Sequence, residues 1–382
     1  MNKREQFDSI TGLRAIACLC IVCYHFFCLY IDDAGLGREQ LPWYPQSAFF
    51  FEYAKNAAEL FFLLSGFLTA WHTRSRIDGL AFGTYGKRKY RKLFGASVVV
   101  NLWALVNLRL MDQAGLGAAA VTPLRFLLSV LMINTGWFTS YAQTQLPVAG
   151  TMWYVDILLL CTLLYDAVCR IGKNRGVYLA LCAGMVFLGW ICLDRTPNLP
   201  FLWALDGRGY VPFFLGALLS EFQRNAGDRQ RTVVTRLWFG FAAAFFLFHS
   251  AVGFERVFGS FGTLRYVRYF EFIAAPGILL AALNLTPVRT VLSWKPLVWL
   301  GGLSAAVYYV HNNVMQDYLI LNELTGSKLN LLTPVSFLLI VLSMIPWAML
   351  YRALEETAVR RKRAAVRTCR QHSDVSKGEE KH

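Results

Sequence analysis

Charged residues are scarce in this sequence of 382 residues: Asp, Glu, Lys and Arg together make up 16%, whereas 56% of the residues are hydrophobic. An average soluble protein is about 25% charged, and a soluble domain of this length could not bury so much apolar surface. The composition therefore excludes a disordered chain and an ordinary soluble enzyme. It predicts an all-α membrane protein with one helical bundle over residues 1–355 and a charged, partly disordered tail over 356–382.

Several motifs are also missing. The sequence has no Walker A motif and no Rossmann glycine pattern, which disfavours nucleotide hydrolysis and dinucleotide redox chemistry. Cys20 and Cys23 form a single C-x-x-C without a second pair, so no metal site is predicted. The net charge of +14 comes from basic residues between apolar segments. Membrane lipid, rather than nucleic acid, is the expected partner of these charges.

Ten apolar segments approach the length of about 20 residues that a membrane-spanning helix requires. They lie near residues 10–31, 57–73, 93–111, 153–169, 176–193, 208–222, 236–252, 268–284, 297–320 and 331–351. The segment 125–135 is apolar but too short to span, and we expect a short re-entrant or interfacial helix there.

The basic residues are concentrated in alternate connecting segments. Residues 73–92, 170–175, 224–236 and the C-terminal tail are rich in Lys and Arg, whereas 112–124 and 136–152 contain almost none. Positively charged loops stay on the cytoplasmic side of a membrane. The pattern predicts a multi-pass protein of the cell membrane with both termini in the cytoplasm.

Two ionisable residues lie in the first apolar segment, LRAIACLCIVCYH. Arg14 and His25 are 11 residues apart, about three helical turns, so they share one helix face at a separation of about 16 Å along the axis. Ionisable side chains inside a membrane are costly and are candidates for function. An Arg that reaches lipid phosphate and a hydrogen-bonded interior His would account for the same pattern.

The second segment, ELFFLLSGFLTAW, begins with Glu59 at a predicted depth similar to that of His25. Ser65 and Gly66 form a pair of small residues near its middle. Such a pair permits close helix packing and could also admit a narrow, extended ligand.

Three later features carry polar groups. The basic run KRKYRK at residues 87–92 precedes the third span and would suit a polyanion, although it could also serve only to set the topology. Trp153 and Asp156 lie at the predicted outer start of the fourth span, and LGGLSAAVYYVH ends at His311.

These segments resemble acyltransferase family 3, the multi-spanning membrane O-acyltransferases of surface polysaccharides. The first segment has the family's Arg and His separated by ten residues, and ELFFLLSGFL, KRKYRKLF and LGGLSAAVYYVH follow in the family's order over about 300 residues. Two positions depart from the family pattern. Asp156 stands where a Glu is usual, and Leu93-Phe94-Gly95 replaces a Tyr-Pro pair.

The resemblance implies transfer of an acyl group from cytoplasmic acyl-CoA, with acetyl-CoA as the expected donor, to a hydroxyl group of a cell-surface or lipid-linked glycan, without a metal. His25 would be the general base, oriented by Glu59, and His311 a second acid/base or substrate-binding group. The donor would contact Arg14, Ser65, Gly66, Arg88 and Arg91. The acceptor would contact Trp153 and Asp156.

Two other functions fit the same residues. A secondary transporter could use the intramembrane His and Arg as a proton or anion path, although no repeat is visible in the sequence. A non-catalytic membrane receptor would tolerate the departures from the family pattern. Stabilisation of the protein by acyl-CoA would distinguish the enzyme from both.

Overall fold

The computed structural model describes residues 3–27, 54–77, 81–117, 120–138, 147–195, 197, 199–259, 262–326, 333–354 and 357. Within these residues the chain is helical and contains no β-strand, as predicted. The principal helices are α1 (Lys3–His25), α3 (Ala57–Ile77), α4 (Thr84–Gln113), α5 (Pro123–Val130), α7 (Trp153–Ile171), α8 (Arg175–Arg195), α9 (Ala204–Asn225), α10 (Asp228–Val252), α13 (Ala275–Asn284), α15 (Lys295–Thr325) and a last helix, Pro334–Leu354.

Short elements connect these helices. They are η4 (Ala54–Asn56), η5 (Gly150–Met152), α11 (Phe254–Phe258), α12 (Gly262–Tyr269), η6 (Phe270–Ala274) and α14 (Thr286–Leu292). The predicted tail over 356–382 lies outside the described residues except for Thr357, as do residues 28–31 of the predicted first span.

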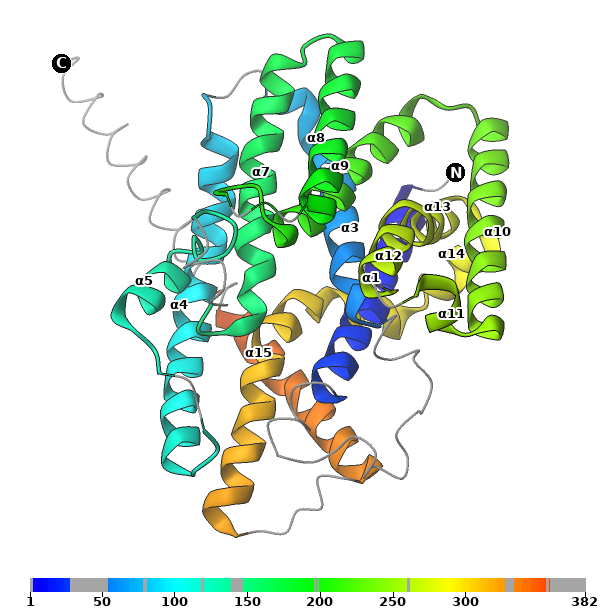
Figure 1. The fold of residues 1–382 in the computed structure, drawn as a ribbon. Coiled ribbons are helices and arrows are strands. Elements are labelled where there is room, and N and C mark those ends of the chain that lie inside the picture. Colours follow the sequence, from blue (N-terminus) through cyan, green and yellow to red (C-terminus); the bar gives the residue numbers. More distant parts are fainter. Residues whose placement is uncertain are drawn as a thin grey trace, which may run out of the picture.

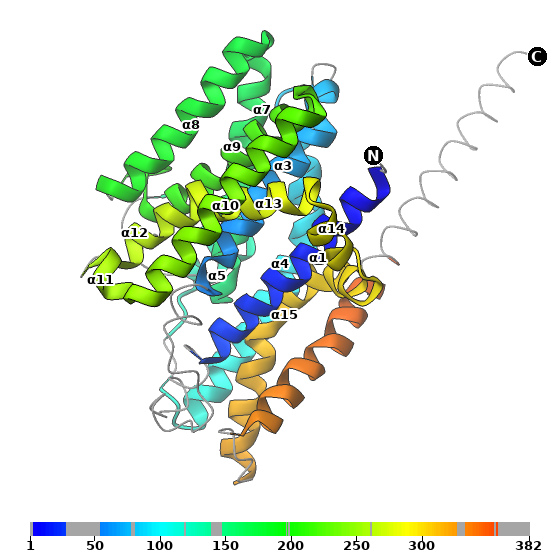
Figure 2. The same ribbon diagram turned by 90° about the vertical axis from the view of Figure 1, so that its right-hand side faces the viewer.

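Helix α3 lies at the centre of the bundle and packs along α9 (Figures 1 and 2). This contact is close because two glycines face the partner backbone. A Cβ atom on Gly66 would overlap the backbone of Phe213, and one on Gly216 would overlap the backbone of Leu63. Gly66 therefore permits close helix packing, as small residues in membrane helices commonly do.

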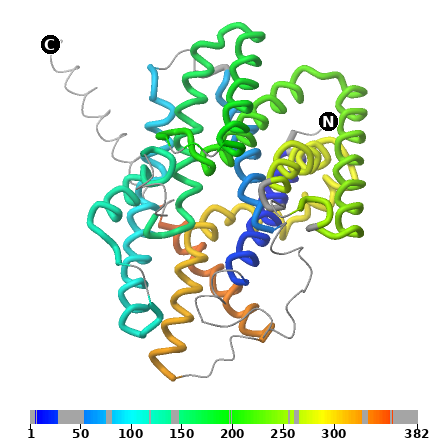
Figure 3. The backbone as a smooth tube through the Cα atoms, viewed as in Figure 1, coloured from blue at the N-terminus to red at the C-terminus, as the bar shows by residue number. Residues whose placement is uncertain are grey.

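Helix α1 connects two parts of the bundle. It packs along α15 on one side and contacts α3, α13 and α14 on the other. In the backbone trace of Figure 3, the blue tube of α1 runs from the yellow-green helices towards the orange C-terminal helices. Arg14 and His25 therefore lie on a helix that has neighbours along its whole length.

Seven of the ten predicted spans coincide with helices that are long and apolar enough to cross a membrane. They are Phe7–His25, Thr84–Gln113, Gly150–Ile171, Arg175–Arg195, Asp228–Val252, Arg265–Asn284 and Pro334–Leu354. The apolar part of Gly150–Ile171 is 78% buried within the protein, whereas that of Asp228–Val252 is only 17% buried. The first is thus a central helix and the second a peripheral one whose apolar side chains face outwards.

The remaining three predicted spans, 57–73, 208–222 and 297–320, are the continuous helices α3, α9 and α15. These helices are long enough to cross a membrane but fall outside the apolar set, since they carry polar residues such as Glu59, Arg208 and His311. Polar and ionisable side chains of membrane helices face the interior of the bundle rather than the lipid.

Two local features differ from the sequence prediction. The basic run at 87–92 was expected before the third span, but α4 begins at Thr84, after Gly83 at φ 75°. The run therefore lies within the helix, because Lys and Arg are good helix formers. The predicted span 268–284 contains the π-helical segment η6, which the apolar pattern does not indicate. The short helix α5 overlaps the segment near 125–135, where a short helix was expected.

Candidate active site

Two cavities lie next to each other in the bundle. The first, here called the Arg14 cavity, has a volume of about 260 Å³ and is lined by residues from α1, α3, α4, α7 and α15. The second, the His25 cavity, has a volume of about 280 Å³ and is lined by residues from α1, η4, α3, α7, α9 and α15. Tyr308 lines both cavities and is therefore part of the wall that they share.

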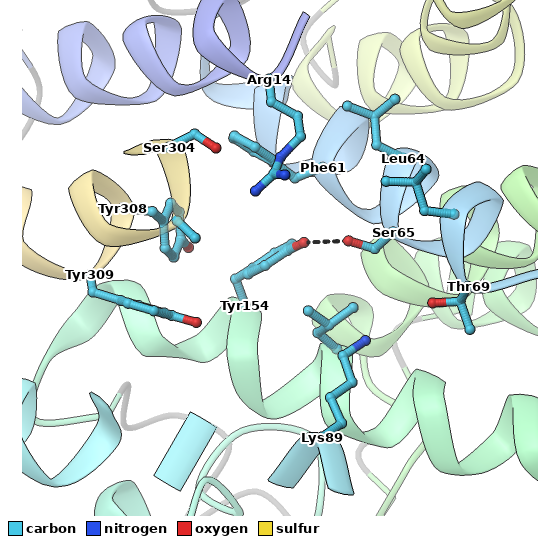
Figure 4. A pocket seen from close by; sticks show the side chains of 13 residues that line it. Arg14, Phe61, Leu64, Ser65, Thr69, Lys89, Tyr154, Ser304, Tyr308 and Tyr309 are labelled. Carbon is cyan, nitrogen blue, oxygen red and sulfur yellow. Dashed lines mark hydrogen bonds between the residues drawn. The ribbon is translucent and has the colours of Figure 1, made fainter. Parts of the chain in front are cut away.

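The Arg14 cavity contains two cationic side chains. Figure 4 shows Arg14 and Lys89 entering from opposite sides, with Tyr154 between them. Among the described residues that line this cavity, none is acidic. Two cations without a lining carboxylate make the cavity a favourable site for an anion.

Lys89 is held in place by α7. Its Nζ atom donates a hydrogen bond of 2.9 Å to Thr162 Oγ1, and the Thr162 hydroxyl donates in turn to the backbone oxygen of Leu158 at 2.7 Å. The single hydroxyl hydrogen of Thr162 is thus used, so its oxygen is free to accept from Lys89. Two of the three ammonium hydrogens of Lys89 have no part in this contact.

Ser65 and Gly66 face different neighbours. Ser65 lines the Arg14 cavity, where its hydroxyl lies 3.2 Å from the hydroxyl of Tyr154 (Figure 4). Gly66 instead packs against α9, as described above. Both of these small residues were expected to contact the donor, but only Ser65 lines the cavity.

His25 and His311 are hydrogen-bonded side by side. His25 Nδ1 lies 2.5 Å from His311 Nε2, and the two rings are parallel within 2°. His311 is fully buried, and its Nδ1 lies 2.8 Å from the backbone oxygen of Tyr308. Because a carbonyl oxygen only accepts, His311 Nδ1 carries the hydrogen of that bond.

This arrangement assigns the tautomers of the neutral pair. With a hydrogen on Nδ1, His311 accepts at Nε2, and His25 Nδ1 donates to it. His25 Nε2 then carries a lone pair. His25 lines the His25 cavity, so a basic nitrogen of this residue is available for chemistry there.

Glu59 pairs with Arg208 of α9. The Arg208 guanidinium forms an ion pair with Glu59 Oε1 and lies 5.0 Å from the centre of the Trp153 ring. Glu59 is fully buried, and among the described residues its Oε2 has no hydrogen-bond partner. The structure does not join Glu59 to His25; among the described residues His311 takes the place expected for the orienting carboxylate.

Trp153 and Asp156, the two residues expected to contact the acceptor, lie in different environments. Trp153 lines the His25 cavity together with Arg208. Asp156 lines neither cavity. It is fully buried and accepts a hydrogen bond of 2.9 Å from the backbone of Thr135, so it anchors the segment before α7.

Arg88 and Arg91 are exposed on α4 and line neither cavity. Lys89, which the sequence analysis included only as part of the basic run, is the member that reaches the Arg14 cavity. The sequence contains a signal for this choice. Gly86, Lys89, Leu93 and Ala96 follow helical spacing, and all four are at least partly buried, which places Lys89 on the inner face of α4.

Tyr154, Tyr308 and Arg208 were not predicted. Tyr154 and Tyr308 lie within apolar segments, where a Tyr resembles any other core residue, and Arg208 lies at the predicted boundary of a span. Their position at the cavities results from contacts between helices that are far apart in the sequence.

Comparisons with known proteins bear on the family alone. The family model for acyltransferase family 3, described as an acyltransferase domain, matches residues 7–353, which include every residue of the two cavities. No curated protein and no solved structure matches the chain. The match extends over nearly the whole chain, and the helices that carry the cavities lie inside it. The chain therefore belongs to acyltransferase family 3 and is a helical membrane protein of the acyltransferase class.

Proposed function

We propose that the protein is an O-acyltransferase of the cell membrane, with both termini in the cytoplasm. It transfers an acyl group, acetyl in the simplest case, from cytoplasmic acyl-CoA to a hydroxyl group of a cell-surface or lipid-linked glycan. The observation that supports this most directly is the pair of cavities that share the wall formed by Tyr308. One contains two cations, and the other contains the basic nitrogen of His25.

The Arg14 cavity is the proposed donor site. Coenzyme A is a polyanion attached to a narrow, uncharged arm that ends in the thioester. Arg14 and Lys89 supply the positive charge for its phosphates, and the hydroxyls of Ser65 and Tyr154 supply hydrogen bonds for the polar arm. Arg88 and Arg91, which are exposed on the same helix, would contribute at most to the attraction of the donor from solution.

The His25 cavity is the proposed reaction site. His25 Nε2 takes the proton of the acceptor hydroxyl while the hydroxyl oxygen attacks the thioester carbon. When the carbon–sulfur bond breaks, the thiolate of CoA takes this proton from His25 Nε2. One alcohol and one thioester thus give one ester and one thiol, and no covalent intermediate with the protein is needed.

His311 acts through His25. Its Nε2 accepts the Nδ1 hydrogen of His25, which keeps Nε2 of His25 unprotonated and fixes its ring. When His25 takes up the proton from the hydroxyl, the same bond stabilises the imidazolium. We therefore describe His311 as a positioning residue and His25 as the catalytic residue. Arg208, held by Glu59 against Trp153, would orient the acceptor.

The proposal is tested with purified protein in lipid nanodiscs, radiolabelled acetyl-CoA and extracted surface glycans, with mass spectrometry of the product. His25→Ala should lower the transfer rate by about 10²- to 10⁴-fold, the usual contribution of a general base. His72→Ala, which changes an exposed His on α3, is the control and should leave the rate unchanged.

Wild-type activity in the His25→Ala protein would contradict the assignment. Transport of a labelled solute into vesicles without any acyl donor would instead support a transporter.

A further inference from the structure

The side chain of Tyr308 is held in place by a hydrogen bond and by burial. Its hydroxyl donates a hydrogen bond of 2.7 Å to the backbone oxygen of Thr151 in η5, and only 6% of the residue is exposed. The bond connects α15 to the segment immediately before α7. The hydroxyl hydrogen is used in this contact and is not available to a ligand in either cavity.

Other aromatic rings support this ring. The ring centres of Tyr154 and Phe61 lie 5.3 Å and 6.3 Å from that of Tyr308, and the ring of Tyr309 lies at 6.4 Å. Phe61, Tyr154 and Tyr309 also line the Arg14 cavity (Figure 4). An aromatic cluster of this kind resists displacement, because its members lose contact area when one of them moves.

The position of the wall determines where an acyl group can lie. On the proposed function, the thioester approaches from the Arg14 cavity and the hydroxyl from the His25 cavity, so the reacting carbon must lie beside Tyr308. An acyl chain that extends beyond this carbon can be accommodated in only two ways. It can displace the aromatic cluster, or it can enter the His25 cavity, whose 280 Å³ the acceptor must share.

We propose that the ring of Tyr308 limits the acyl group to a short one and thereby makes this protein selective for acetyl over longer acyl donors. The inference rests on the proposed function and adds the substrate class of the donor site. It assigns the selectivity to the volume of the ring, which the aromatic cluster holds in place even when the hydroxyl is removed.

The test compares three proteins: wild type, Tyr308→Phe, which keeps the ring, and Tyr308→Ala, which removes it. Competing acetyl-, butanoyl- and hexanoyl-CoA are supplied to protein in nanodiscs, and the ratio of kcat/KM values is measured. Wild type and Tyr308→Phe should both favour acetyl over hexanoyl by tenfold or more. In Tyr308→Ala the ratio should move towards hexanoyl by at least tenfold, since each methylene group that finds apolar space is worth about fourfold in binding.

A binding measurement tests the selectivity even if a variant is inactive or no acyl transfer is detected. Non-reactive thioether analogues of acetyl- and hexanoyl-CoA are compared by the shift in melting temperature that they cause, in the same three proteins and in Tyr308→Leu. The same order of selectivity should appear without any transfer.

Equal use of acetyl and hexanoyl donors by wild type would overturn the inference, as would equal relaxation in Tyr308→Phe and Tyr308→Ala. Selective binding of the analogues without transfer to any acceptor would contradict the proposed function while supporting the inference.

Discussion

The two cavities differ in how their positive charge is balanced. The Arg14 cavity is lined by the cations Arg14 and Lys89, and none of the described residues that line it is acidic. In the His25 cavity, Arg208 is already paired with the buried carboxylate of Glu59, Lys55 is a second lining cation, and His25 supplies the imidazole. Two cations that make no ion pair among the described residues attract a polyanion, whereas a neutral base beside an ion-paired arginine suits an uncharged hydroxyl. On the proposed function, this difference gives the donor and the acceptor separate binding sites in one bundle.

The largest expected effect comes from removing the partner of His25. His311→Phe keeps an aromatic ring but cannot accept the hydrogen of His25 Nδ1. We expect kcat to fall by about 10²-fold or more, with little change in the KM of the donor, for which we propose the other cavity. Steady-state kinetics with separately varied donor and acceptor measure this split.

A matched variant separates positioning from simple packing. His311→Gln offers an amide oxygen that can accept from His25 Nδ1 and should retain at least tenfold more activity than His311→Phe. The double variant His25→Ala/His311→Phe should be no slower than His25→Ala, because both changes act on one base. Equal activity of the Phe and Gln variants would show that His311 only fills space.

The charge balance of the His25 cavity is tested by Glu59→Gln. This change keeps the shape of the buried Glu59 side chain but leaves the partly buried Arg208 guanidinium without its carboxylate. Loss of one partner of a buried ion pair costs about 3 kcal/mol of stability, so the melting temperature should fall. The control is Glu59→Gln/Arg208→Gln, which removes both charges and should recover part of the loss. An unchanged melting temperature in the single variant would mean that the pair is well solvated.

The opposite cavity is tested by Lys89→Met, which keeps most of the side-chain length and removes the charge. A charge-assisted hydrogen bond to a phosphate contributes about 1.5–3 kcal/mol, so the KM for acyl-CoA should rise by about ten- to a hundredfold while kcat at saturation is preserved. Lys87→Met removes the same charge from an exposed position on the same helix and should change KM by less than twofold. Similar effects of both variants would assign the role to the basic run as a whole.

The sequence predicted much of this molecule. The apolar segments predicted the helices, and the spacing of Arg14 and His25 placed both on one face of α1, where the structure has them in adjacent cavities. The choice of Lys89 over Arg88 and Arg91 was not predicted, because the run was assigned to a connecting segment and the start of α4 at Thr84 was missed.

Pairings between distant residues could not be predicted either. Glu59 and Arg208 are 149 residues apart, and His25 and His311 are 286 residues apart. Each of these contacts depends on how α1, α3, α9 and α15 pack, and a single sequence gives the face of each helix but not its neighbour. The expectation that Glu59 orients His25 came from their similar depth alone, which does not distinguish between partners on different helices.

The smallest expected effect concerns Thr162, the residue that holds Lys89. Thr162→Val has nearly the same volume and removes only the hydroxyl, so it leaves the charge of Lys89 in the cavity without its anchor. Thr162 would affect the donor only through the position of Lys89, whose charge remains, so the KM for acyl-CoA should rise by only a few-fold. In the Lys89→Met background, Thr162→Val should add nothing, since there is no ammonium group left to position. If Thr162→Val alone raises KM as strongly as Lys89→Met, the hydroxyl contacts the donor itself, and the Arg14 cavity would depend on neutral hydrogen bonds as much as on charge.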